Sequence, residues 1–167
     1  MRRLTHFIMF VCIAASLLCA CSTFDCPLNN RVYASMRLAG EVKTLDDTLT
    51  VSIPLSHDDD GSDTVVVNRL TGTDSLALPM SYMRTEDIYL LHIAQRDTRL
   101  QTTDTMWVAK ENEKHFESVD CSPAMFHTIT GIRFTQHAID SITINNNKVT
   151  YNDSKAHFLI YLKNRSN

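Results

Sequence analysis

The chain has 167 residues, a formal net charge of −3 and 44% hydrophobic residues. This length suits one domain with a core of its own. A mildly acidic chain with scattered basic residues lacks the basic stripe that nucleic-acid binding demands, so we expect no nucleic-acid partner.

The first 20 residues have the layout of an export signal. Arg2 and Arg3 precede an uncharged, largely apolar run over residues 7–20, which is shorter than the roughly 20 residues that a spanning helix needs. The run ends in "LCAC", whose last cysteine is Cys21. This ending resembles the lipobox of bacterial lipoproteins. We predict a signal over residues 1–20 and lipidation of Cys21; a plain cleaved signal and an uncleaved anchor are the alternatives.

Cleavage leaves two cysteines without a lipid, Cys26 and Cys121. In an oxidising compartment such a pair is typical of a disulfide. The bond would enclose 94 residues and contribute about 4 to 5 kcal/mol in the chain-entropy model. The alternative is a reactive thiol at Cys121, with His115 or His127 as its base.

The predicted lipid and the predicted disulfide lie close together in sequence. Four residues separate Cys21 from Cys26, and four extended residues span at most about 14 Å. We therefore expect residues 21–26 to be a short tether that holds the domain against the bilayer. A single β-domain over residues 27–163 and a polar tail over residues 164–167 complete the predicted organisation.

The mature chain is a series of short segments with the two-residue period of β-strands. Asp followed by Thr or Ser opens four of them, at Asp47, Asp63, Asp104 and Asp140, and we interpret this Asp as a turn residue before a strand. In chain order the predicted strands cover residues 32–39, 48–55, 65–70, 76–80, 88–94, 105–110, 125–135, 142–144, 149–151 and 158–163.

Short polar connections separate these strands. Asp60-Gly61 and the run Asn145–Asn147 predict hairpin turns. No segment keeps a helical period for three turns. We therefore predict an all-β fold, namely an antiparallel β-sandwich that is immunoglobulin-like or related, with a small β-barrel as the runner-up.

The segment over residues 125–135 needs one irregularity to be a strand. Its apolar residues change parity after Ile129, and a bulge at Gly131 would return them all to the buried face. This arrangement points His127 inward and His137 outward.

Residues with chemical potential are scattered along the chain. The acidic loop before Asp63 would place Ser56 and Val67 at key ligand positions of a calcium loop, so we interpret it as a solvated hairpin. HExxH and GxSxG motifs are absent, and we expect His92 to be a hydrogen-bonded core residue. We expect no cofactor and no enzymatic activity. A metal-dependent hydrolase would need at least three of these residues to converge: His92, His115, His127, His157, Glu117 and Asp120.

The segment from His115 to Lys163, which includes "SVDC" and "AIDSI", and the early "FDCPLNN" resemble a family of small Bacteroidota lipoproteins with a domain of unknown function. The resemblance implies export but no activity, cofactor or catalytic residue. Surface-exported lipoproteins of that phylum tend to carry an acidic cluster after the lipidated cysteine. "STFD" holds only Asp25, so the resemblance implies the periplasmic face of the outer membrane.

The sequence thus predicts a lipid-anchored, non-enzymatic domain of the cell envelope that binds an envelope protein or a glycan. One alternative is a carrier that encloses a small apolar ligand in a β-barrel or sandwich cavity. The other is the envelope hydrolase described above. A roomy, closed apolar cavity would favour the carrier, and a solid core would count against it.

Overall fold

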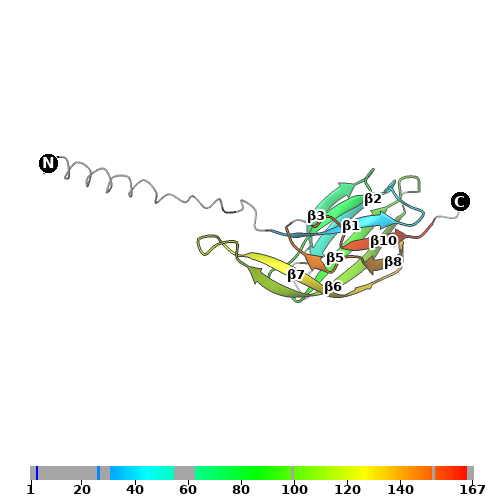
Figure 1. Cartoon of the computed structure of the whole chain (residues 1–167). Helices are drawn as coiled ribbons and strands as arrows, with labels where there is room; N and C mark the ends of the chain where they lie inside the picture. Colours follow the sequence, from blue (N-terminus) through cyan, green and yellow to red (C-terminus); the bar gives the residue numbers. More distant parts are fainter. Residues whose placement is uncertain are drawn as a thin grey trace.

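A computed structural model describes residues 3, 26, 31–54, 63–98, 100–151 and 153–164 of the chain. These residues form ten strands (Figure 1). Among them, no helix has the length and apolar character that crossing a bilayer requires. The strands are β1 Tyr33–Ala39, β2 Thr48–Pro54, β3 Asp63–Leu70, β4 Ser75–Pro79, β5 Glu86–Ala94, β6 Gln101–His115, β7 Ala124–Phe134, β8 Ile139–Ile144, β9 Lys148–Val149 and β10 Phe158–Leu162.

The strands form two sheets that pack face to face. One sheet has the order β3-β2-β5-β6-β7-β9 and the other the order β4-β1-β10-β8. Neighbouring strands run antiparallel except β1 and β10, which pair in parallel from Met36↔Phe158 to Ala39↔Tyr161. The sheets do not close on each other, so the predicted β-sandwich is confirmed and the barrel is not formed.

The core lies between the sheets because side chains alternate along each strand. Tyr89, Leu91 and Ile93 of β5 are buried from one side. Met36 of β1 and Phe158 of β10 are buried from the other side and belong to the same cluster. The two-residue period read from the sequence is therefore what places each strand in a layer.

The predicted bulge in β7 is present. Ala109 pairs with Gly131, but the next residue of β6, Lys110, pairs with Ile129. Thr130 is thus the extra residue on β7, and it is exposed. The bulge keeps the buried face of the strand continuous across the change of parity.

The run Asn145–Asn147 does not form a hairpin turn, contrary to our prediction. It follows β8, which pairs with β10, and precedes β9, which pairs with β7. The run therefore carries the chain from one sheet to the other. The backbone N–H groups of Asn145 and Asn146 donate to the carbonyl oxygen of His157 at 2.8 and 3.3 Å. The predicted turn at Asp60-Gly61 lies outside the described residues.

β6 runs five residues beyond its predicted end at Lys110. The last residue pair between β5 and β6 is Glu86↔Ala109, and from there β6 pairs only with β7, as far as His115↔Ala124. The two strands thus extend past the sandwich as a hairpin, visible in Figure 1 on the N-terminal side. No second sheet covers this part of the hairpin, so its residues do not alternate between apolar and polar. The sequence pattern therefore did not reveal the extension of β6.

Candidate functional site

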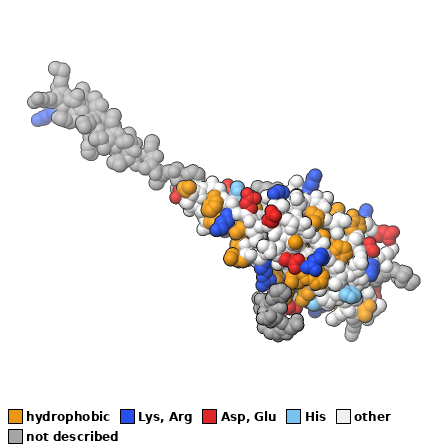
Figure 2. All heavy atoms as spheres, turned by 90° about the horizontal axis from the view of Figure 1, so that it is seen from below, with side chains coloured by type: hydrophobic (Ala, Val, Ile, Leu, Met, Phe, Trp, Pro, Cys, Tyr) orange, Lys and Arg blue, Asp and Glu red, His pale blue; other side chains and the backbone are white. Residues whose placement is uncertain are grey.

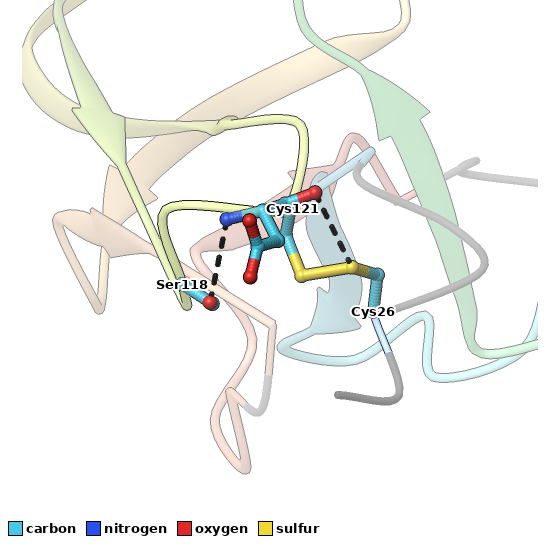
Figure 3. Close-up of a disulfide and its surroundings, with 4 residues drawn as sticks. Cys26, Ser118 and Cys121 are labelled. Atoms are coloured by element: carbon cyan, nitrogen blue, oxygen red, sulfur yellow. Dashed lines mark hydrogen bonds between the residues drawn. A yellow bond between two sulfur atoms is a disulfide. The ribbon is translucent and has the colours of Figure 1, made fainter. Parts of the chain in front are cut away.

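The end of the β6–β7 hairpin carries the predicted disulfide. Cys26 and Cys121 are bonded, with Cα atoms 5.5 Å apart (Figure 3). The Cys121 N–H donates to the carbonyl oxygen of Ser118 at 3.2 Å, which closes the turn. A bonded sulfur provides no thiolate, so this structure does not offer the nucleophile of the alternative interpretation. The predicted lipid site, Cys21, lies outside the described residues.

Apolar side chains are exposed beside this disulfide. Val119 is 98% exposed and Phe116 is 60% exposed. Behind them, the ring of His115 stacks on Phe126 with centroids 4.2 Å apart, and Phe126 meets Tyr151 edge-on at 5.1 Å. Figure 2 shows hydrophobic side chains at this narrow end of the described body. We call the segment Phe116–Cys121 the hairpin tip.

A buried polar network supports the base of the hairpin. The Lys110 ammonium group, which is fully buried, donates to the carbonyl oxygens of Ser81 and Arg84 at 2.5 and 2.6 Å and to Asn112 Oδ1 at 2.7 Å. Asp87 lies 3.6 Å from it. Burial lowers the pKa of Lys110 and raises that of Asp87, and the attraction between the two charges opposes both shifts.

His127 joins this network from β7 and points inward, as predicted. Its Nδ1 lies 2.7 Å from Asn112 Oδ1, so Nδ1 carries the proton and donates. Its buried Nε2 has no hydrogen-bond partner among the described residues. Burial, with a smaller effect of the charge of Lys110, lowers the pKa of His127 to about 4. The ring is therefore neutral at pH 7.

Asp104 ties β6 to the crossing between the two sheets, and it is not the turn residue that we predicted. Its carboxylate is fully buried and accepts five hydrogen bonds of 2.7 to 3.1 Å from Thr135 Oγ1, His137 N and Nδ1, Ala138 N and Ile139 N. Burial raises the pKa of Asp104, but these bonds outweigh burial, so the pKa lies below its ordinary value. His137 itself points outward, as predicted.

The outer face of the six-stranded sheet has a groove of about 500 Å³. No acidic residue lines it. We call it the arginine–threonine groove, after the residues that define it: Thr48, Thr50, Arg69, His92, Arg96 and Thr103. The two arginines were not singled out by our sequence analysis, because their segments come together only through the pairing of β2, β3 and β5.

His92 lies in this groove and not in the core, contrary to our prediction. It is half-buried on the face of β5 opposite to Leu91 and Ile93. The predicted hydrogen bonding is present: Nε2 lies 3.1 Å from Ser52 Oγ and Nδ1 lies 2.8 Å from Thr103 Oγ1.

Two other cavities test whether the sandwich could enclose an apolar ligand, as the carrier hypothesis requires. The wholly apolar cavity between the sheets, near Leu38, Leu91 and Ile160, has a volume of about 20 Å³. This volume holds about one water molecule. A cleft of about 370 Å³ lies between Leu45 and Leu162, but it is open and includes Asp46 and Lys163. The core between the described residues is thus nearly solid, which counts against the carrier.

The residues proposed for a hydrolase do not converge. His115 Nε2 meets Glu117 Oε1 at 3.2 Å, whereas His157 bonds to Ser35 and Asp153. Within the described part of the chain, no three His, Cys, Asp or Glu side chains are placed to hold a metal ion.

The comparison with known families gives a match over most of the chain. Residues 48–162 match DUF6452, a family of unknown function. The chain belongs to this family. The matched residues include Cys121 but not Cys26 or β1. Since β1 lies between β4 and β10 in its sheet, the matched segment needs β1 to complete the sandwich. No curated protein and no solved structure matches the chain.

Proposed function

We propose that this chain is an exported lipoprotein, anchored through Cys21, whose sandwich acts as a non-enzymatic binding domain in the cell envelope. The observation that supports the anchoring best is the bond between Cys26 and Cys121. It links the body of the domain to the chain five positions after the lipobox cysteine. A disulfide also fits an oxidising, exported location.

In this proposal the hairpin tip faces the bilayer. The tether of four residues reaches at most about 14 Å, so Cys121 lies near the lipid headgroups. Exposed Phe116 and Val119 lie next to it and can bury apolar area in the headgroup region. Glu117 and Asp120 flank them, so the acyl chains and apolar contacts hold the tip there, without attraction to anionic lipid.

The binding role rests on a packed sandwich with a concave, polar outer face. The partner in this proposal is a glycan or another protein of the envelope. We propose the periplasmic face of the outer membrane as the location, because only Asp25 provides negative charge in the four residues after Cys21.

Mass spectrometry of the full chain tests the anchor. The protein is expressed in a bacterium with two membranes, extracted from the membrane fraction and measured intact and as peptides. We expect a chain that begins at Cys21 and carries acyl groups, and we expect Cys21→Ser to keep residues 1–20. An unmodified Cys21 in the wild-type protein would contradict the proposal.

A further inference from the structure

We infer that the arginine–threonine groove binds an acidic saccharide. Strand register builds the floor of the groove. Thr50 pairs with His92, and His92 pairs with Thr103. Thr48 and Gln101 pair with Ala94 in the same way, two positions along the strands. Two parallel rows of hydroxyl, imidazole and amide groups therefore cross β2, β5 and β6 on one face.

Charge is supplied by Arg69 and Arg96. Arg96 opens the turn after β5, where its N–H donates to Asp47 Oδ1 at 3.2 Å and so holds the turn. Other arginines have carboxylate partners, such as Arg37 with Asp74 and Arg133 with Glu86, each at 2.9 Å. Among the described residues no ion pair of Arg69 or Arg96 is found. Both residues are exposed, so their side chains are accessible to a ligand.

The backbone at Arg69 has a left-handed conformation. Its φ is 50°, in the left-handed region that costs a residue with a side chain roughly 1 kcal/mol or more. The register of β2 and β3 shifts between Leu49 and Val51, so Arg69 also lies at a β-bulge. Strain of this kind is concentrated at functional sites.

A chain of hydrogen bonds orders the floor of the groove. Ser52 Oγ donates to Asp63 Oδ2 at 3.4 Å and also lies 3.1 Å from His92 Nε2. His92 Nδ1 lies 2.8 Å from the Thr103 hydroxyl. Because these groups are already oriented, a ligand loses less free energy in fixing them.

The lining indicates the class of ligand. Guanidinium groups form bidentate hydrogen bonds with carboxylate or phosphate groups. The threonine and glutamine side chains can hydrogen-bond the hydroxyl groups of a sugar. The groove lining contains no Phe, Tyr or Trp ring, so neutral sugars lack a large stacking surface and the acid group must contribute much of the affinity. The groove volume of about 500 Å³ falls within the roughly 300 to 1,000 Å³ of ordinary ligand sites.

The groove lies far from the hairpin tip. Thr103 and His115 are at opposite ends of β6, which puts roughly 40 Å of strand between them. In the proposed orientation the groove therefore lies at the end of the domain that is remote from the bilayer. This inference names the ligand class of the proposed binding role, but it does not depend on the lipid anchor.

Titration calorimetry with the full chain in nonionic detergent tests the inference. The probes are hexagalacturonate, neutral maltohexaose and polyglutamate. We expect hexagalacturonate to bind, with affinity that falls as salt rises, and maltohexaose not to bind. Arg69→Ala and Arg96→Ala should each weaken binding about tenfold or more. Arg37→Ala removes the same charge from the other sheet and should leave the affinity for hexagalacturonate unchanged. Cys21→Ser should bind like the wild type, which separates this test from that of the anchor.

Arg69→Gly separates folding from binding. Glycine suits φ 50°, so we expect Arg69→Gly to have unchanged or slightly higher stability in urea. We expect it to lose as much affinity as Arg69→Ala. The inference would be overturned by no binding of hexagalacturonate, by equal binding to the Arg69→Ala, Arg96→Ala double variant, or by tighter binding of polyglutamate, which would assign the groove to an acidic peptide.

Discussion

At the scale of single residues, Asp104 stabilises the crossing between the sheets. The crossing leaves β7 and enters β8, and three backbone N–H groups there donate to a side chain. Asp104 accepts all three, from His137, Ala138 and Ile139. One buried carboxylate thus satisfies three backbone donors, including that of the buried Ile139.

We predict that Asp104→Asn destabilises the fold by about 2 to 4 kcal/mol. The amide NH₂ of the asparagine would face backbone N–H groups, which now donate hydrogen bonds to a carboxylate oxygen of Asp104. Two donors would then face each other, and those hydrogen bonds would be lost. Urea denaturation followed by circular dichroism measures the change. Asp140→Asn, at an exposed position of β8, is the control and should stay within about 0.5 kcal/mol of the wild type. Equal stability of the two variants would contradict this role for Asp104.

The same residue predicts a pH dependence. The pKa of Asp104 in the folded chain is lower than its ordinary value of 3.8, so its stabilising effect is complete above that value. It is lost as pH falls through the lower, folded pKa. The difference in unfolding free energy between wild type and Asp104→Asn should therefore shrink below about pH 4. Urea titrations between pH 2 and pH 7 measure it, and a constant difference would contradict the assignment.

At the scale of elements, the β6–β7 hairpin depends on a crosslink and a buried network in place of a covering sheet. Lys110 and Asn112 fix its base to the β4–β5 connection at Arg84. Cys121 fixes its tip to Cys26. The hairpin is therefore held at both ends, although β5 does not continue beside it.

We predict that the Cys26→Ala, Cys121→Ala double variant loses about 4 to 5 kcal/mol of stability, because the unfolded chain is no longer constrained by a loop of this length. Urea denaturation of the oxidised wild type and the variant measures the loss. Reduced wild type is the control, and it should match the variant. If reduction leaves the midpoint unchanged, the bond does not contribute to stability.

At the scale of the whole molecule, the two ends of the sandwich have different roles in our proposal. The hairpin tip lies at the tethered end, and the arginine–threonine groove lies at the other. Leu100, 56% exposed, precedes β6 at the groove end. Val119, 98% exposed, follows β6 at the tip. The two residues make a matched pair of reporters.

We predict that tryptophan fluorescence of Val119→Trp is quenched by brominated lipids when the lipidated protein is reconstituted in vesicles. Leu100→Trp should not be quenched beyond the background from Trp107. The physical reason is the tether, which leaves the tip within about 14 Å of the anchor point. Equal quenching at both positions would show that the domain has no fixed orientation on the bilayer.

Local patterns in the sequence were sufficient for the strands and the crosslink. Short apolar and alternating segments located all ten strands of the described chain, because most strands have one face against the core. The change of parity after Ile129 revealed the bulge next to Gly131. Counting the cysteines that remain after the predicted export signal paired Cys26 with Cys121, and the bond is present. Each of these inferences needed only neighbours in sequence or a count.

Tertiary structure decided what depends on distant partners. Asp104 and Lys110 lie on the same buried face of β6 as Met106 and Val108. Only the folded chain shows which donors and acceptors offset the free-energy cost of burying these charges. The parallel pairing of β1 with β10 and the passage of Asn145–Asn147 between sheets follow from packing of the layers. The groove has the same origin, because strand register brings its two arginines to one face.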